Sequence, residues 1–265
     1  MPTRPEGELI DLALARDPVP IDDLVASTGG VLAIAPHPDD ETLGCGLALR
    51  SALAAGRDVA VLLLTGGGAS HPGSARYPCE NLKALRRAEF VRALDALSHG
   101  MPDGSGRLVH AMLDLPDGSV PHDGDHDDLR APLADARVAA LELARSVNAG
   151  TVWVTWSGDP HSDHVAAALL ADGILRRWGG GEQPLRLDYA VWGRFGAAGR
   201  EVSPARVLAF RSDPHLPAKR AAMRAYASQL TPMIDDDPDG FVMPPALVEH
   251  FAAAPEIFLV REPGS

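Results

Sequence analysis

Short apolar runs alternate with longer stretches of helical spacing, and this alternation limits the folds that the chain can adopt. Residues 31–35 and 58–64 are dominated by Val, Ile, Leu and Ala, and residues 41–55 and 82–97 carry apolar side chains at helical spacing. Strands that alternate with helices are typical of βαβ units and of parallel sheets. Because the two strand runs are apolar throughout, we expect helices to cover both faces of the sheet.

The same alternation continues along the chain and predicts one large α/β domain. Further strands are expected at 108–113, 151–156, 185–192, 206–210 and 256–260, and further helices at 129–147, 165–178 and 218–229. We therefore predict a Rossmann-like, doubly wound, mostly parallel sheet with a 3-2-1-4 type core. Residues 1–29 are interpreted as an N-terminal extension and 30–262 as a single domain, in which 184–262 complete the pocket and the sheet edge.

Charge and cysteine content exclude several classes of protein. The chain has 36 acidic and 24 basic side chains, and a net charge of −12 argues against nucleic acid as a partner. Its two cysteines, Cys45 and Cys79, lack the spacing of a disulfide framework or of a thiolate zinc site. The N-terminus lacks the pattern of a signal peptide, and no apolar run approaches the roughly 18 residues of a membrane span. We therefore expect a cytoplasmic protein without a membrane span.

Two motifs rich in histidine and carboxylate follow the first and fourth expected strands. Residues 35–41 read Ala-Pro-His-Pro-Asp-Asp-Glu, and residues 158–164 read Gly-Asp-Pro-His-Ser-Asp-His. Taken alone, the first motif is equally well explained as an acidic helix start. In a 3-2-1-4 sheet, however, strands one and four are neighbours, and ligands bind beyond their carboxyl ends. The topology therefore predicts that the two motifs meet.

The residue types in these motifs are those of a catalytic metal site. Such a site uses three nitrogen or oxygen ligands and leaves one position open for water. His37, Asp40 and His164 can supply these ligands, and because they are imidazole and carboxylate groups they do not distinguish Zn²⁺ from Fe²⁺ or Co²⁺.

Three other side chains in the motifs remain available for chemistry. Asp39 is next to a ligand and can act as general base toward a metal-activated water. His161, when protonated, can stabilise an oxyanion or protonate a leaving amine, and Asp163 can hold its ring. Together these groups predict hydrolysis of a carbonyl compound, most simply an amide.

This arrangement resembles the paired signature of the LmbE-like (PIG-L) zinc-dependent N-acetylglucosaminyl deacetylases. The resemblance spans roughly residues 30–260 and rests on 37–41 and 161–164, with weaker support from Leu64-Thr-Gly-Gly67, Arg86-x-x-Glu89 and Pro116-Asp-Gly118. It implies a Zn²⁺-dependent N-deacetylase that acts on an N-acetylglucosamine-type sugar or its conjugate, with Arg86 at the pocket rim in contact with substrate hydroxyls or a phosphate. Asp159 stands where some members have an aromatic residue, so a mobile aromatic lid is not carried over.

Several interpretations stay open at the level of the sequence. His71, in the long loop 65–78, is a candidate sugar contact or a solvated loop residue, and Arg86 with Glu89 is alternatively a surface ion pair. The loop 122–128 is interpreted as solvated and acidic rather than as a cation site. The alternative function is a non-catalytic metal- or nucleotide-binding module of Rossmann type. The sequence leaves the substrate, the native metal, the oligomeric state and the role of the N-terminal extension undecided.

Overall fold

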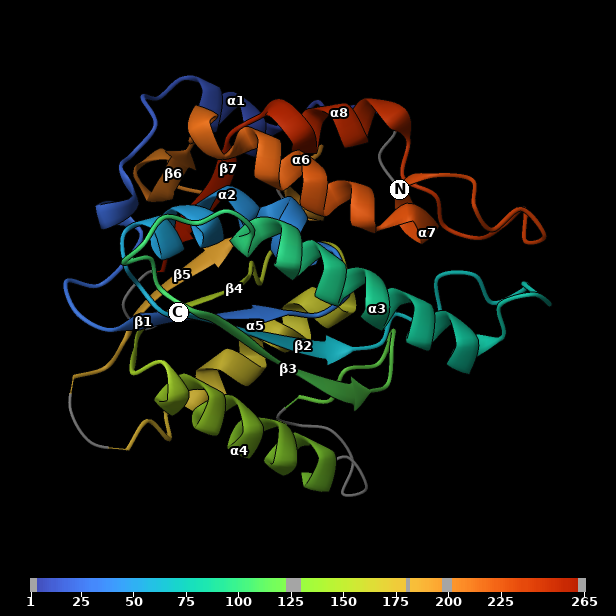
Figure 1. Ribbon diagram of the computed structural model, residues 1–265, viewed down its shortest axis with the longest axis horizontal. Coiled ribbons are helices and arrows are strands. Elements are labelled where there is room, and N and C mark those ends of the chain that lie inside the picture. The colour runs from blue at the N-terminus through green and yellow to red at the C-terminus, as the bar shows by residue number, and fades with distance from the viewer. Residues whose placement is uncertain (1–3, 123–129, 180–181, 197–201, 262–265) are drawn as a thin grey trace.

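A mixed sheet with helices on both faces forms the centre of the molecule (Figure 1). The structure is a computed structural model, and it describes residues 4–122, 130–179, 182–196 and 202–261. Within these residues the sheet has seven strands in the order β3-β2-β1-β4-β5-β7-β6. The strands are β1 Gly30–Ala35, β2 Val59–Thr65, β3 Leu108–Leu115, β4 Ala149–Thr155, β5 Leu185–Tyr189, β6 Val207–Phe210 and β7 Glu256–Val260.

Strand directions follow the predicted pattern through the core and change at one edge. Strands β3, β2, β1, β4 and β5 are parallel, whereas β7 is antiparallel to both of its neighbours, β5 and β6. The predicted α/β fold with core order 3-2-1-4 is therefore confirmed.

Helices pack on the sheet in two layers, one on each face. They are α1 Glu8–Leu14, α2 Asp40–Ala54, α3 Cys79–Ser98, α4 Arg130–Ser146, α5 Ser162–Leu175, α6 Leu216–Ala225, α7 Ala227–Leu230 and α8 Pro245–Ala253. Helices α4 and α5 cover one face over a core that includes Leu32, Leu62 and Val154. Helices α1, α2, α3, α6 and α8 cover the other face (Figure 1). Because both faces are covered, the side chains of β1, β2 and most of β4 are buried.

The expected helix 218–229 and the region after it differ from the sequence prediction. The helix is interrupted at Tyr226, whose backbone angles (φ −87°, ψ 52°) are not helical, and α7 begins directly after it. Helix α8 was not predicted, because its start at Pro244 and Pro245 has the composition of a loop. A proline at the first helical position is compatible with a helix, since the N–H that it lacks has no partner within the helix.

The N-terminal segment packs on the C-terminal part of the sheet. Leu9 of α1 is fully buried, and isolated bridges join Gly7 to Gly196 and Val19 to Phe210. The division of the chain into an extension and one domain stays a prediction. Within the described residues, no helix combines the length and the apolar composition needed to cross a bilayer.

A buried ion pair fixes helix α2, which carries the first motif. The helix departs from regular geometry at Cys45 (φ −143°, ψ 19°). The carboxylate of Glu256 accepts the N–H groups of Leu47 and Ala48 at 2.6 and 2.9 Å, and Lys219 Nζ donates to Glu256 at 2.7 Å and to the Leu43 carbonyl at 3.0 Å. The pair thus satisfies backbone groups on both sides of the break, which otherwise would be buried without partners.

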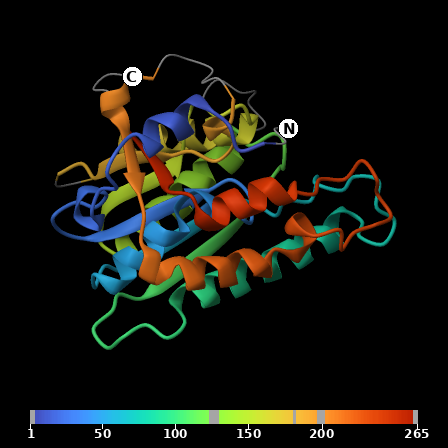
Figure 2. The ribbon, with the colours of Figure 1, turned by 90° about the horizontal axis from the view of Figure 1, so that it is seen from above.

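Two long loops, 66–78 and 231–242, extend side by side away from the sheet (Figure 2). Asp237 accepts the Gly73 N–H at 2.8 Å, and Asp236 accepts the Ser74 hydroxyl at 2.8 Å. These bonds hold the second loop against the first, so that residues far apart in the sequence border one pocket.

Candidate active site

The two motifs meet at the carboxyl ends of β1 and β4. His37 follows β1, whereas His161 caps the start of α5 and His164 lies in its first turn. The ring of His37 lies 4.7 Å from that of His161 and 5.5 Å from that of His164, measured between centroids. The predicted convergence of the motifs is therefore confirmed, and its cause is the adjacency of the two strands.

Asp40 lies at ligand spacing from both of the predicted histidine ligands. Asp40 Oδ2 lies 3.2 Å from His37 Nδ1 and 3.2 Å from His164 Nε2. Ligand atoms about 2.0 Å from a tetrahedral Zn²⁺ are separated by roughly 3.3 Å. His164 is fully buried, and among the described residues its two ring nitrogens contact only the carboxylates of Asp40 and Asp159, without the geometry of a hydrogen bond. Because a buried ring nitrogen requires a partner, this donor set fits a divalent cation.

Carboxylates face the outer nitrogens of the same two imidazoles. His37 Nε2 lies 3.0 Å from Asp163 Oδ2 and 3.1 Å from Asp117 Oδ1, and His164 Nδ1 lies 3.3 Å from Asp159 Oδ2. Histidines that bind a metal usually present their second nitrogen to a carboxylate or a carbonyl, which fixes the tautomer and the ring orientation. Asp159 and Asp117 were not recognised as such partners from the sequence, although each lies in or beside a motif quoted above.

The position of Asp163 corrects one expectation. Its side chain contacts His37 rather than the ring of His161, and it also accepts the N–H groups of Gly118 and Val120 at 2.7 and 3.0 Å. The contact with His161 runs through the backbone, where the Asp163 N–H donates to His161 Nδ1 at 3.2 Å. Asp163 therefore links the loop after β3 to His37, because the first turn of α5 directs its side chain toward β1.

Among the described residues, two overlapping groups of three side chains could hold a metal ion. Within each group, the possible ligand atoms all lie within 4.8 Å of one another. One contains His37, His161 and His164, and the other contains His37, Asp117 and Asp163. Both include His37, and neither includes Asp40, although Asp40 Oδ2 lies 3.2 Å from a ring nitrogen of both His37 and His164.

Asp39 is held in an unusual backbone conformation. Its φ of 132° lies in a region that residues other than glycine rarely adopt, and its side chain is buried. Arg86 Nη2 donates to the Pro38 carbonyl at 2.8 Å and to Asp39 Oδ2 at 3.3 Å, and Nη1 donates to the Gly67 carbonyl at 2.9 Å. Burial raises the pKa of Asp39 to about 8, although the charge of Arg86 opposes this. Such a carboxyl group is suited to accepting and returning a proton near neutral pH.

Glu41 also contacts Asp39, through the Asp39 backbone N–H. Glu41 Oε2 accepts the Asp39 N–H at 3.2 Å, and Oε1 accepts the Tyr226 hydroxyl at 2.5 Å and the Thr42 hydroxyl. Both Glu41 and Tyr226 are fully buried, and burial raises the pKa of Glu41 to about 7. Tyr226 lies at the break between α6 and α7, where the chain turns its side chain toward the first motif. Sequence reasoning missed this residue, since nothing local distinguishes it from a core tyrosine.

The carboxylates make the centre of the site favourable for positive charge. Burial lowers the pKa of His164, but Asp40 and Asp159 outweigh this and raise it to about 10. Burial likewise opposes a charged His37, yet Asp117, Asp163 and Asp40 raise the pKa of this ring. The pKa of Asp40 lies below its usual range because His164 and His37 offset the effect of burial. A divalent cation would likewise offset the negative charge of these carboxylates.

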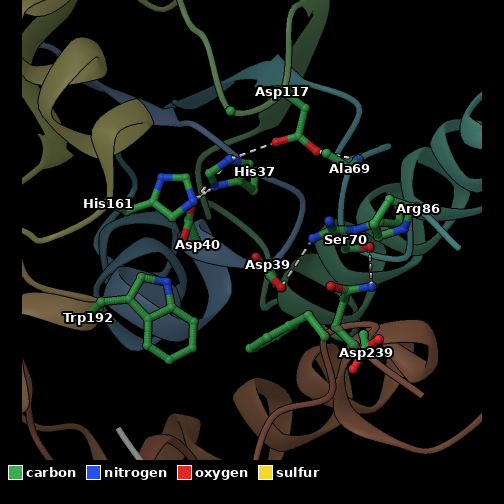
Figure 3. A pocket seen from close by; sticks show the side chains of 14 residues that line it. His37, Asp39, Asp40, Ala69, Ser70, Arg86, Asp117, His161, Trp192 and Asp239 are labelled. Atoms are coloured by element: carbon green, nitrogen blue, oxygen red, sulfur yellow. Dashed lines mark hydrogen bonds and ion pairs between the residues drawn. The ribbon is translucent and has the colours of Figure 1, made fainter. Parts of the chain in front are cut away.

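A cavity of about 350 Å³ opens over these residues (Figure 3). Asp39, Asp40 and His161 line it, and Trp192 and Asp239 lie on the side away from Asp117 (Figure 3). The volume is at the lower end of the roughly 300–1,000 Å³ that is usual for small-molecule pockets.

Two expectations about substrate contacts have different outcomes. Arg86 lines the cavity, but it does not pair with Glu89, whose carboxylate accepts the Ser228 N–H and hydroxyl at 2.9 and 2.6 Å. His71 is buried beside Gly240 and does not line the cavity. Its neighbours in the loop line the cavity instead, since the 231–242 loop covers the imidazole. The expected acidic loop 122–128 falls almost entirely outside the described residues.

Comparison with known proteins agrees with this geometry. Residues 32–175, which contain both motifs, match the family model described as PIG-L: GlcNAc-PI de-N-acetylase. The chain belongs to the PIG-L family. It is 28% identical over 252 residues, covering 77% of this chain and 70% of the relative, to a 1D-myo-inositol 2-acetamido-2-deoxy-alpha-D-glucopyranoside deacetylase of Kineococcus radiotolerans. The identity to the deacetylase of the same description from Nocardia farcinica is 29% over 257 residues, covering 77% and 82% of the two chains.

The PIG-L fold is also found in a solved structure. N,N'-diacetylchitobiose deacetylase from Pyrococcus horikoshii superposes with a TM-score of 0.63 and 18% identity, covering 96% of this chain and 90% of that chain. At this identity the likeness shows the fold alone.

Proposed function

We propose that this PIG-L protein is a metal-dependent N-deacetylase that hydrolyses the acetamido group of an N-acetylglucosamine-type sugar or its conjugate. One observation carries the proposal. Next to the predicted ligands His37, Asp40 and His164, the cavity is lined by an acid–base candidate, Asp39, and by the imidazole of His161, which is not among those ligands. Two deacetylases of an N-acetylglucosamine glycoside among the relatives support this reaction and substrate class.

Asp40 is proposed as a ligand in preference to His161 because it lies 3.2 Å from a nitrogen of each of the other two ligands. When bound, a divalent cation supplies polarisation of the amide carbonyl and a lowered pKa of the attacking water. Zn²⁺ is proposed because it combines imidazole and carboxylate ligands with an open position.

Asp39 is proposed to move the proton. Its carboxylate takes the proton of the attacking water and returns it to the nitrogen of the leaving amine, which converts the amide into acetate and a free amino group. Arg86 and Glu41 hold the residue from two sides, so its position is set before the substrate binds. Preorganisation of this kind lowers the cost of reaching the transition state.

His161 is proposed to stabilise the oxyanion as a neutral ring. Because Nδ1 accepts the Asp163 N–H, the ring carries its proton on Nε2, which can donate to the amide oxygen. Burial lowers the pKa of His161, and nearby His37 and His164 lower it further. The sequence predicts a protonated ring, whereas the structure favours a neutral one. The reason is that His161 caps the start of α5, where Nδ1 accepts a backbone N–H.

Replacement of Asp39 by Asn tests the proposal. Acetate release from N-acetylglucosamine derivatives should fall at least about a hundredfold, in the range observed for loss of general acid–base catalysis. Metal content, measured by mass spectrometry of the purified protein, should not change. Loss of metal together with activity would show that Asp39 is a ligand instead. A non-catalytic binding module, the alternative, predicts that the unchanged chain releases no acetate with any divalent metal.

A further inference from the structure

A row of buried polar side chains leads from helix α3 to the wall of the cavity. Glu89 and Ser228 are fully buried, and Gln229, which is 1% exposed, lines the cavity together with Ser70 (Figure 3). The Ser228 hydroxyl donates to Glu89 Oε2 at 2.6 Å, and Gln229 Nε2 donates to Ser228 Oγ at 3.1 Å and to Ser70 Oγ at 3.2 Å. We call these four residues the polar row. The catalytic proposal above does not use it.

Glu89 determines which atoms of the polar row are donors. Its carboxylate can only accept, and it accepts both the N–H and the hydroxyl of Ser228. The one hydroxyl hydrogen of Ser228 is thereby used, so Ser228 Oγ can only accept from Gln229. Of the two ends of the Gln229 amide, only Nε2 carries hydrogens, and Oε1 in its place would put two acceptors in contact. The orientation of the Gln229 amide therefore follows from the residue types along the polar row.

Gln229 is left with one polar side-chain atom to offer to the cavity. Both hydrogens of Nε2 are used by Ser228 and Ser70, and among the described residues no group donates to Oε1. The backbone is held as well, because the Met243 N–H donates to the Gln229 carbonyl at 2.8 Å. Oε1 is therefore an acceptor whose position is set before a ligand binds. Such an acceptor favours ligands that bring a donor, since a ligand without one leaves it unpaired.

The sugar ring that carries the acetamido group can supply this donor. Gln229 lines the same cavity as Asp39 and His161, the residues proposed to act on the amide. Because the amide is bonded directly to the ring, the ring enters the cavity with it. Hydroxyl groups are the donors that such a ring presents, and an uncharged amide oxygen accepts from them without a charged partner. The family match ends at residue 175, so Gln229 lies outside it.

We infer that Gln229 is a specificity-determining residue, which accepts a hydrogen bond from one ring hydroxyl of the acetamido sugar, and that Glu89 is a positioning residue, which fixes the Gln229 amide through Ser228. The inference rests on the proposed function and deepens it, because it names the residue by which the site distinguishes sugars with and without this hydroxyl.

The test uses four probes that differ in one donor each. The parent is the methyl glycoside of N-acetylglucosamine, which has free hydroxyls at C3, C4 and C6. In each of three analogues, fluorine replaces one of these hydroxyls, so that a group of similar size remains but cannot donate. The variant Gln229→Leu removes the acceptor. Gln183→Leu is the matched control, because the Gln183 side chain is exposed and its amide donates to the Leu175 carbonyl, away from the cavity.

The measured quantity is the ratio of kcat/KM for the parent to that for each analogue. In the unchanged chain, we expect this ratio to be about ten or more for the analogue that lacks the recognised hydroxyl, as for a buried acceptor left unpaired. In Gln229→Leu the same ratio should fall to within about twofold of one, because the parent loses the same hydrogen bond. In Gln183→Leu all three ratios should stay as in the unchanged chain. If Gln229→Leu changes none of the three ratios, the inference is overturned.

Glu89→Gln and Ser228→Ala test the positioning role, since neither residue lines the cavity. A glutamine at position 89 can donate to Ser228 Oγ, and an alanine at position 228 accepts nothing, so in both variants the Gln229 amide is free to turn. We expect the ratio that Gln229→Leu reduces to fall in these variants too. A purely structural role would lower Tm and slow all four probes equally, and unchanged ratios in both variants would refute the positioning role.

Calorimetric binding of the parent and the analogues to Asp39→Asn, with and without Gln229→Leu, separates this inference from the proposed function. If the unchanged chain releases no acetate but Asp39→Asn discriminates against one analogue in a Gln229-dependent way, only the proposed function fails. If acetate is released but no ratio depends on Gln229, only the inference fails. Absence of binding of all four probes to Asp39→Asn contradicts the inference.

Discussion

Substitution of Tyr226 by Phe tests how Asp39 is positioned, because it removes one hydroxyl group and leaves the ring in place. The hydroxyl donates to Glu41 Oε1 at 2.5 Å, and the other oxygen of Glu41 accepts the Asp39 N–H. A hydrogen bond to a buried charged group contributes about 1.5–3 kcal/mol to stability. For a chain of this size, a loss of about 2 kcal/mol lowers Tm by roughly 4–8 °C.

The effect on catalysis should exceed what this loss of stability explains. Asp39 has a φ of 132°, a conformation that costs on the order of 1–3 kcal/mol and persists only where neighbours impose it. When Glu41 loses the tyrosine, it can turn away and allow Asp39 to relax. We expect kcat for acetate release to fall about tenfold or more at 25 °C, with KM little changed, since small displacements of a reacting group have effects of this size.

Tyr189→Phe is the matched control. Tyr189 is equally buried, and its hydroxyl donates to a backbone carbonyl, that of Ile34 in β1, at 2.8 Å rather than to the carboxylate that holds Asp39. This variant should lower Tm, measured by thermal unfolding, but keep kcat within about twofold. The reasoning is refuted if Tyr226→Phe keeps the kcat of the unchanged chain, or if Tyr189→Phe loses as much.

Three further predictions concern stability and metal binding. Lys219→Met leaves the buried carboxylate of Glu256 unpaired and should lower the free energy of unfolding, measured by urea titration, by about 3–5 kcal/mol. The double variant Lys219→Met/Glu256→Gln should recover much of this loss. If it recovers none, the ion-pair explanation is wrong. Burial, with Arg194 and Lys219 nearby, lowers the pKa of His250 to about 3, below its unfolded value, so stability should be lost as the pH falls below about 6.5. Between pH 7 and pH 5.5 this loss should be about 1 kcal/mol smaller in His250→Gln than in the unchanged chain, allowing for partial exposure; equal losses would refute the assignment. Asp40→Ala should abolish metal binding measured by calorimetry and His161→Ala should retain it, and the reverse result would place His161 among the ligands.

The sheet and the meeting of the two motifs were predictable because their causes are local or topological. The continuous apolar runs that became β1 and β2 identify buried parallel strands, and the order of a doubly wound sheet makes β1 and β4 neighbours. The predicted ligands could be chosen on residue type alone. Helix α8 could not be predicted, since prolines at its start are compatible with either a loop or a helix.

The contacts that orient the site were not predictable, because they join residues far apart in the chain. Tyr226 reaches Glu41 across 185 positions, and Asp163 reaches His37 across 126. Even at close range, side-chain direction decided the outcome, since the first turn of α5 directs Asp163 away from His161. His71 shows the same limit, because only the docking of the 231–242 loop buries its imidazole.

The most direct test of the central claim is acetate release from an N-acetylglucosamine-type sugar or its conjugate as a function of bound metal. We expect that protein stripped with a chelator releases no acetate, and that activity returns in proportion to added Zn²⁺ up to one ion per chain. The same titration with Asp39→Asn should show full metal binding without acetate release. Acetate release by the metal-free chain, or full metal binding to the unchanged chain without any release, would contradict the account.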